Sequence, residues 1–336
     1  MITISLCMIV KNEEKTLQRC LDSIKDRMDE IIIIDTGSTD RTMEIASAYT
    51  DKIYSYQWIN DFSDARNFSF SKATMDYIYM ADADEVLDEA NGILFDQLKQ
   101  VLLPEIDIVQ MTYCNQLKFG TVYNFDEELR PKLFKRIRTF HFEDPIHETI
   151  VLDPIIFDSD IKILHLPECS HATRDLAIFH NVYSGEKRIS KRLHSLYAKE
   201  LFIYGDDQEF FKALPIFEKT LKDSTRSIDE IKEATCVIAK ANRLKNDVPN
   251  FFKNALKNTA CDGCSEICFE LGEYYFKLSD YEEAIIWYYN AAYETECILN
   301  IHYCGDYPLL ALSKCYHALG NADKAREYKE LAIAWK

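Results

Sequence analysis

The chain of 336 residues lacks both a long hydrophobic run and a basic leader. No segment reaches the ~18 consecutive apolar residues that a membrane-spanning helix needs. The N-terminus does not combine basic residues with a following apolar stretch, as a secretory signal does. These absences predict an intracellular, cytoplasmic protein with no membrane span.

Clustered positive charge is also missing, because 56 acidic residues outnumber 39 basic ones and give a formal net charge of −17. Nucleic acid is therefore not an expected partner, since phosphate groups favour clustered Lys and Arg side chains. The glycine strings GxGxxG and GxxxxGK[ST] are absent as well. Their absence argues against a dinucleotide-dependent dehydrogenase and against a P-loop enzyme.

Paired CxxC motifs are absent, although the chain has 11 cysteines. Cys261, Cys264 and Cys268 form a cluster, and no histidine lies beside it at the spacing of a zinc finger. We interpret these cysteines as reduced helix residues. A zinc site at the cluster is the alternative.

The most informative segment is an apolar strand that ends in two carboxylates one residue apart, Asp82 and Asp84. In an extended segment alternate side chains share a face, so both carboxylates can point at one ligand while Ala83 packs behind them. Such a pair suits a hard divalent cation, Mn²⁺ or Mg²⁺, that carries a diphosphate. A solvated loop or helix cap, where Asp-x-Asp pairs are also common, is the alternative.

Strands and helices alternate through the N-terminal half. Strand-like segments lie at 2–10, 30–34, 52–58 and 77–81, with helical segments at 15–25, at 41–49 and after Asn60. This alternation predicts right-handed crossovers and a parallel sheet, on which ligands bind beyond the carboxyl ends of the strands. Polar side chains follow these ends, namely Asn12, Asp35, Asp61 and the pair Asp82 and Asp84. We therefore expect the loops that carry them to converge on one rim.

Four motifs together resemble family 2 glycosyltransferases of the GT-A fold. They are residues 5–14, residues 34–40, residues 61–67 and the acidic segment 82–85. The resemblance covers the first half of the chain. It implies an α/β catalytic domain at residues 1–175, with a Rossmann-like, mostly parallel sheet.

The resemblance also implies a binding site for a UDP-sugar donor. The matching positions are Val10, Asn12, Glu14, Asp35, Asp61, Arg66, Asp82 and Ala83. In that family the loop matching Asp35 reads the uridine, and the arginine matching Arg66 approaches the nucleotide. The acidic pair matching Asp82 and Asp84 meets the ribose and the metal. For Asp35, a turn that caps the following helix is the alternative.

Two further blocks, residues 130–136 and 142–148, resemble the part of this family that brings the acceptor-side carboxylate into the cleft. Inverting transfer needs one general base to take the proton of the acceptor. We predict that Glu148 is this base, with Asp144 as the second choice. An ion pair of Glu148 with Arg136 or Arg138 is the alternative without catalysis.

His165 ends an apolar segment at the place where GT-A enzymes often carry a third metal ligand. With Asp84 and Asp82 it makes up the metal site that the resemblance implies. A buried structural histidine is the alternative, and His147 competes for the ligand role. The metal would offset negative charge on the departing diphosphate.

From about Ile178 the pattern becomes helical, and residues 176–336 are expected to form a tetratricopeptide-like domain. The offsets of such a helix pair are matched by Leu271, Gly272, Tyr275, Ala284, Tyr288 and Ala291, and again in part by Tyr316, Ala325 and Ala332. The wider spacing of the second unit predicts an insert at 294–306, and residues 193–241 are consistent with earlier, degenerate pairs. Stacked pairs form a concave surface suited to peptides, and their exposed faces leave room for a homodimer.

The sequence therefore predicts a metal-dependent inverting glycosyltransferase that moves N-acetylglucosamine or glucose from a UDP-sugar to a protein or peptide side chain. The combination of domains resembles bacterial flagellin O-glycosyltransferases, which favours Ser or Thr. It also resembles S-glycosyltransferases that modify cysteine in glycopeptide bacteriocins. Transfer to a saccharide or lipid in envelope polysaccharide assembly is a second hypothesis. An inactive scaffold is the third.

Overall fold

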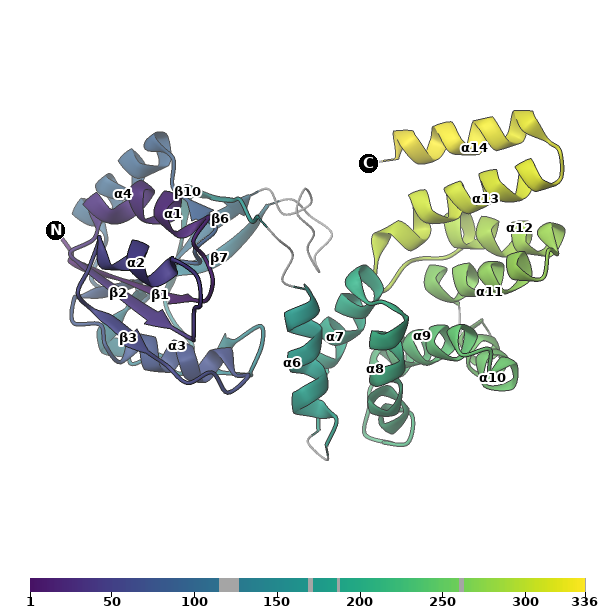
Figure 1. Ribbon diagram of the computed structural model, residues 1–336, viewed down its shortest axis with the longest axis horizontal. Coiled ribbons are helices and arrows are strands. Elements are labelled where there is room, and N and C mark those ends of the chain that lie inside the picture. The colour runs from purple at the N-terminus through teal and green to yellow at the C-terminus, as the bar shows by residue number, and fades with distance from the viewer. Residues whose placement is uncertain (115–126, 169–171, 186–187, 260–262, 336) are drawn as a thin grey trace. The chain divides into compact units, whose positions relative to one another are not determined.

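The structure is a computed structural model that describes residues 1–114, 127–168, 172–185, 188–259 and 263–335 (Figure 1). The chain divides into two compact units, Met1–His171 and Ala172–Lys336. The first is α/β and the second is helical, so the predicted fold class is confirmed. Helix α6 (Ala172–Tyr183) begins ahead of the predicted boundary at residue 176. The catalytic and acceptor-binding roles given to the two halves stay predictions.

The described part of the first unit is built on an eight-stranded sheet in the order β3-β2-β1-β4-β7-β6-β10-β5. Its strands are β1 (Ile4–Val10), β2 (Glu30–Asp35), β3 (Ile53–Ser55), β4 (Tyr77–Met80), β5 (Glu85–Val86), β6 (Ile108–Cys114), β7 (Glu128–Lys135) and β10 (Ile156–His165). The strands β1 to β4 run parallel, as the sequence predicts. In contrast, β7 is antiparallel to both of its neighbours, β4 and β6.

Alternating side chains of β1 cover both faces of this sheet. The even-numbered residues point to the face under α1 (Leu17–Ile24), α2 (Thr42–Ser47) and α4 (Glu89–Val101). The odd-numbered residue Cys7 points to the opposite face, which α3 (Phe62–Phe70) and the hairpin of β8 (Phe142–Glu143) and β9 (Thr149–Ile150) cover. Figure 1 shows α3 on the other side of the sheet from α1, α2 and α4. Burial on both faces explains why β2 reads as a continuous apolar run.

The second unit consists of helices that pack mainly against their neighbours in sequence. They are α6, α7 (Lys191–Tyr204), α8 (Asp207–Thr220), α9 (Ile228–Leu244), α10 (Val248–Thr259), α11 (Ser265–Lys277), α12 (Tyr281–Tyr289), α13 (Asp306–Ala318) and α14 (Ala322–Ala334), with η3 (Asn290–Glu294) and η4 (Ile301–Cys304) before α13. The predicted repeat residues fall on α11 and α12, with Ala291 on the adjoining η3, and on α13 and α14. A Cβ at Gly272 would approach the ring of Tyr288 to 2.6 Å, so glycine allows this helix pair to pack closely.

The insert between α12 and α13 lies against the first helices of earlier pairs. Backbone N–H groups of residues 298–300 donate to the buried carboxylate of Glu266 on α11. The side chain of Asn300 donates to the carbonyl of Phe202 on α7 at 3.1 Å. Lys240 on α9 donates to the hydroxyl of Tyr303 at 2.7 Å. The insert is therefore an integral part of the helical unit.

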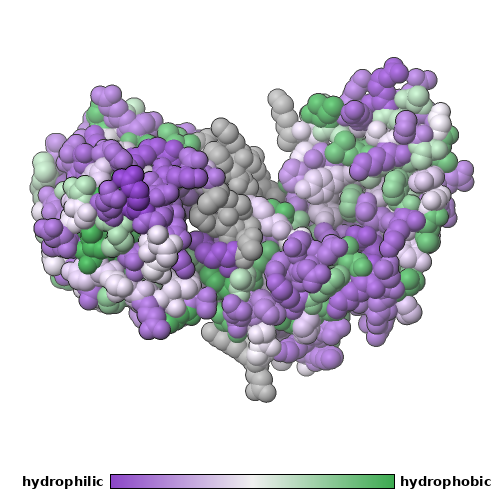
Figure 2. All heavy atoms as spheres, viewed as in Figure 1, coloured by the Kyte–Doolittle hydropathy of each residue, from purple (hydrophilic) through white to green (hydrophobic). Residues whose placement is uncertain are grey.

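The surface seen in Figure 2 carries mainly hydrophilic side chains, with apolar ones scattered among them. Exposed apolar residues such as Ile137 and Ile333 lie far apart in the sequence. Among the described residues, no helix combines the length and the apolar character that crossing a membrane requires.

Candidate active site

Polar loops meet at the carboxyl edge of the parallel strands. Val10 and Asp35, the last residues of β1 and β2, are partners in register. The N–H of Thr36 donates to the carbonyl of Val10 at 3.0 Å. On the other side of β1, β4 is also parallel, so the acidic segment after it reaches the same edge.

Polar residues at or just after the ends of β1 and β2 form hydrogen bonds with the loop that leads into α2. Each accepts a hydrogen bond from a backbone N–H of that loop: Asp35 from Ser38 (3.0 Å), Asn12 from Thr39 (2.8 Å) and Glu14 from Arg41 (3.2 Å). Asp61 caps α3 by accepting from the N–H of Asp64 at 3.1 Å. These bonds shape the loops, which is the structural alternative considered for Asp35. Donor contacts by the same residues stay predictions.

Asp82 and Asp84 follow β4 and differ in exposure. Asp82 is exposed, whereas Asp84 is buried. Asp84 Oδ2 lies 3.2 Å from His165 Nε2, and the N–H of Leu166 donates to the carbonyl of Asp84 at 2.9 Å. The other oxygen, Asp84 Oδ1, is buried and has no hydrogen-bond partner among the described residues. The structure thus brings the predicted metal ligands Asp84 and His165 together.

This pair fits a divalent cation. A buried carboxylate oxygen without a partner is costly, and a cation would satisfy it. Carboxylate oxygens suit Mn²⁺ and Mg²⁺, and an imidazole nitrogen favours Mn²⁺ of the two. Asp82 on the same loop offers a further carboxylate.

An ion pair that the sequence analysis missed lies beside the acidic loop, residues 82–85. Lys132 of β7 contacts Glu85, and their side chains are only 2% and 3% exposed. Burial raises the pKa of Glu85 to about 7, although Lys132 acts in the opposite direction. Desolvation alone would raise the pKa of Asp82, but the positive charges of Lys132 and Arg66 outweigh this effect. The pKa of Asp82 therefore lies below its usual range. Positive charge around the loop therefore keeps Asp82 ionised.

Arg130 and Tyr113 continue this wall of the site. The guanidinium of Arg130 lies 4.0 Å from the centre of the Tyr113 ring, and the centres of the Tyr113 and His165 rings are 5.0 Å apart. Lys132 also lies near this ring, with its ammonium 5.1 Å from the ring centre. Two basic residues within the short segment 130–132 are the signal in the sequence that points to them.

Glu148, the predicted base, forms an ion pair with Arg66 on α3. Arg66 Nη2 lies 3.3 Å from Glu148 Oε1, and their side chains are 10% and 16% exposed. The partners considered for the non-catalytic alternative are therefore wrong, because Arg136 donates to a backbone carbonyl and Arg138 pairs with Asp107. Burial lowers the pKa of Arg66, but Glu148 and the acidic loop outweigh it and raise that pKa.

Asn67 fixes the turn that carries both candidate bases. Its side chain donates to the carbonyl of Phe142 at 3.0 Å and accepts from the N–H of Phe142 at 2.8 Å. Within the turn, Asp144 and His147 have left-handed φ values of 77° and 51°. This tight backbone directs the chain back from β8 so that Glu148 reaches Arg66. Asp144 remains the second choice for the base.

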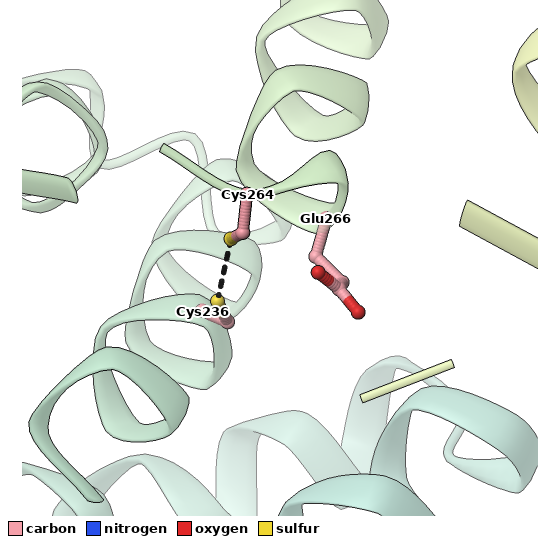
Figure 3. Close-up of side chains that lie close together, drawn as sticks. All are labelled: Cys236, Cys264 and Glu266. Atoms are coloured by element: carbon pink, nitrogen blue, oxygen red, sulfur yellow. Dashed lines mark hydrogen bonds between the residues drawn. The ribbon is translucent and has the colours of Figure 1, made fainter. Parts of the chain in front are cut away.

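Cys236, Cys264 and Glu266 lie close together in the helical unit (Figure 3). This group is less suited to a metal than the acidic loop. The sulfur atoms of Cys236 and Cys264 lie 3.4 Å apart, and Glu266 is near them. However, Glu266 already accepts backbone hydrogen bonds, and burial raises the pKa of Cys236, which favours the neutral thiol. Cys264 and Cys268 are free, as expected of reduced residues, and Cys261 lies outside the described residues.

A surface cavity of about 690 Å³ lies at the other edge of the sheet, near the start of β2. Its lining includes Lys25, Glu30 and Lys52. Lys52 pairs with Glu30, and Lys25 pairs with Asp22. These charged groups already neutralise one another, so the cavity offers less reactive chemistry than the acidic loop.

Comparison with known proteins bears on the first unit. Residues 5–113 match the family model described as Glycosyl transferase family 2. A TPR repeat-containing protein of Synechococcus elongatus is 38% identical over 152 residues, which cover 45% of this chain and 36% of that protein. The SPbeta prophage-derived glycosyltransferase SunS of Bacillus subtilis is 34% identical over 169 residues, which cover 48% of this chain and 39% of that protein.

The match spans well under half the length of those two relatives. An uncharacterized glycosyltransferase of Rickettsia bellii is 28% identical over 202 residues, or 55% of this chain and 66% of that protein. Among solved structures, glucosyl-3-phosphoglycerate synthase from Mycobacterium tuberculosis, in complex with Mn²⁺ and UDP-glucose, aligns with a TM-score of 0.41 and 15% identity. That alignment covers 55% of this chain and 77% of the synthase.

Proposed function

The N-terminal unit contains a glycosyltransferase domain of family 2, and from this premise we propose that the chain transfers a sugar from a UDP-sugar to a protein or peptide side chain. The transfer is cation-dependent and inverts the anomeric centre. N-acetylglucosamine and glucose are the favoured sugars. Ser or Thr is the favoured acceptor residue.

The observation that carries the proposal is the arrangement of charges at the carboxyl edge of the sheet. Asp84 and His165 lie 3.2 Å apart on one side, and Glu148 meets Arg66 on the other. The guanidinium of Arg66 feels the charge of the base and of the acidic loop, because Glu148 and Asp82 both raise its pKa. A metal-binding pair, a cation for phosphate and a carboxylate base are the groups that transfer from a nucleoside diphosphate sugar requires.

Each of these groups has a task in the proposed reaction. Asp84, His165 and Asp82 hold the divalent cation, which offsets negative charge on the diphosphate. Arg66, whose Nε has no hydrogen-bond partner among the described residues, donates to a phosphate oxygen. Glu148 takes the proton of the acceptor hydroxyl as its oxygen bonds to the anomeric carbon, and the bond from that carbon to UDP breaks.

The helical unit is the proposed site of acceptor binding. Stacked helix pairs form extended surfaces for peptides, and a relative of this chain is named for its TPR repeats. Transfer to the sulfur of a peptide cysteine is the second candidate, because a match to SunS joins the resemblance to glycopeptide S-glycosyltransferases. A saccharide or lipid acceptor is the third.

The test is to incubate the chain with Mn²⁺, a panel of UDP-sugars and a lysate of its host. UDP release and the masses of the lysate proteins are then measured together. We expect release with one sugar and a mass increase of that sugar on a protein, with fragment spectra that place it on Ser or Thr. A sugar on Cys would favour the second candidate, and release without modified protein the third. Absence of UDP release with every sugar would contradict the proposal.

A further inference from the structure

We propose that Lys132 is a positioning residue that holds the acidic loop in shape for a divalent cation, an inference that rests on the proposed function. Lys132 would touch neither the cation nor the donor. It acts through Glu85, the carboxylate that follows the predicted ligand Asp84 in the sequence.

The acidic loop has to keep like charges close together. Asp82, Asp84 and Glu85 fall within four consecutive positions. Repulsion between carboxylates grows as they leave water, and both Asp84 and Glu85 are buried. Without Lys132, Glu85 would lose the cation that holds this end of the loop in place.

Lys132 supplies the positive charge from a fixed place. It lies on β7, which is hydrogen-bonded to β4 on one side and to β6 on the other. Its ammonium contacts Glu85 and lies 5.1 Å from the centre of the Tyr113 ring. Because Pro131 and Leu133 on either side of it are paired with β6, the sheet fixes the backbone from which this charge projects.

The ladder between β5 and β10 passes the effect of this contact on to the metal ligands. Glu85 and His165 are backbone partners in the antiparallel ladder. One residue earlier, the carbonyl of Asp84 accepts from the N–H of Leu166 at 2.9 Å. Anchoring Glu85 therefore keeps Asp84 and His165 at the distance of 3.2 Å at which both can bind one cation.

A bound cation would supply part of the positive charge that Lys132 provides to the acidic loop. It neutralises the same carboxylates that Lys132 faces, so the lysine matters most before the cation binds. A lysine that only stabilised the fold would matter equally with and without the cation. This difference separates positioning from general stabilisation.

The experiment follows amide hydrogen exchange of the full chain, with and without Mn²⁺, in peptides covering residues 81–86. In Lys132→Met without Mn²⁺ we expect exchange at least about tenfold faster than in the unchanged chain, because one partner of a buried ion pair is lost. Saturating Mn²⁺ should return it to within about threefold of the unchanged chain.

Lys99→Met is the matched control. Lys99 is also nearly buried and pairs with Asp29 at 3.0 Å, but it lies on α4, away from the acidic loop. Its loss should leave exchange at residues 81–86 unchanged. Lys132→Arg, which keeps the charge, should restore slow exchange. The double variant Glu85→Gln with Lys132→Met removes both charges and should exchange more slowly than Lys132→Met alone.

Two results would overturn the inference: unchanged loop exchange in Lys132→Met, or faster exchange that Mn²⁺ does not slow. If Lys132→Met fails to fold, the double variant Glu85→Gln with Lys132→Met is measured in its place. Loop exchange in this variant that is faster than in the unchanged chain, even with Mn²⁺, would also overturn the inference. Binding of Mn²⁺ to the unchanged chain is measured alongside by electron paramagnetic resonance. Absence of that binding would instead count against the cation-dependent function itself.

Discussion

Single side chains at the carboxyl edge of the sheet carry the proposed chemistry, and Arg66 has two roles in it. Arg66 holds Glu148 at 3.3 Å and faces the charge of Asp82. Arg66 Nη2 keeps Glu148 in place, whereas Nε, which has no hydrogen-bond partner among the described residues, is left to donate to a phosphate oxygen. The same side chain would therefore hold the base and the donor together.

The first prediction concerns Glu148. Glu148→Gln keeps an oxygen that can accept from Arg66 but removes the base, so transfer should fall by ~10²-fold or more while donor affinity changes little. Initial rates of UDP release in the presence of acceptor, together with calorimetric donor binding, measure both quantities. Asp144→Asn is the control and should retain most of the activity. Full turnover in Glu148→Gln would move the base to Asp144.

A second prediction concerns the pH dependence of stability at Glu30, far from the site. Burial raises the pKa of Glu30, but hydrogen bonds from Lys52, Ser5 and Thr74 outweigh it and lower this pKa from 4.5 to about 2. The stabilisation is therefore complete above pH 4.5 and is lost as the pH falls toward 2.

Urea unfolding of Glu30→Gln and of the unchanged chain at a series of pH values measures this effect. The variant should be less stable at pH 7, and the difference between the two proteins should shrink as the pH falls from 4.5 to 2. The exposed Glu105, replaced by Gln, should show no such convergence. A constant difference between Glu30→Gln and the unchanged chain would contradict the assignment.

Individual strands show what local patterns can predict. The continuous apolar run of β2 and the strand-like start of the chain identified both strands, and the alternation of strands with helices predicted their parallel pairing. β7 was missed, because Arg130, Pro131 and Lys132 interrupt its apolar pattern. The structure explains each of them. The two cations line the site, and Pro131 lies beside a shift in the register with β6, where a missing N–H is tolerated.

Contacts between distant segments set the limit for the site. The sequence placed Asp84 and His165 in one site only through the family resemblance, and the structure brings them to 3.2 Å. The pairing of Arg66 with Glu148 spans 82 positions, and no local pattern encodes it. Sequence alone offered Arg136 and Arg138 as partners because they are close along the chain.

The insert between α12 and α13 yields a third prediction. Glu266 accepts from the backbone N–H groups of residues 298–300, so Glu266→Ala leaves these buried donors without their acceptor. The free energy of unfolding should fall by about 3 kcal/mol, which urea unfolding measures. Glu296→Ala, an exposed change in the same insert, should cost less than about 0.5 kcal/mol. Equal effects of the two changes would contradict this role.

The whole chain joins an α/β unit to a helical unit, Met1–His171 and Ala172–Lys336. The described site residues lie in the first unit, and the second offers helix pairs and an insert. This division suggests that donor chemistry and acceptor choice are separable. The sugar and the acceptor depend on the bound ligands, which no residue pattern of this chain specifies.

A fourth prediction follows from that division. A fragment of residues 1–171 should retain slow, Mn²⁺-dependent hydrolysis of the UDP-sugar but lose transfer to protein. UDP release and protein mass spectra, with circular dichroism as a check on folding, measure the two activities. Transfer to protein by the folded fragment would mean that the helices do not select the acceptor.

The most direct test of the account is the affinity for UDP, measured by calorimetry with Mn²⁺ and with a chelator. The account predicts that UDP binds with Mn²⁺, and that the chelator or Asp84→Asn weakens binding at least about tenfold. Asp96→Asn, an exposed change on α4, should leave the affinity unchanged. Equal affinity with Mn²⁺, with chelator and in Asp84→Asn would contradict a cation-dependent donor site at the acidic loop.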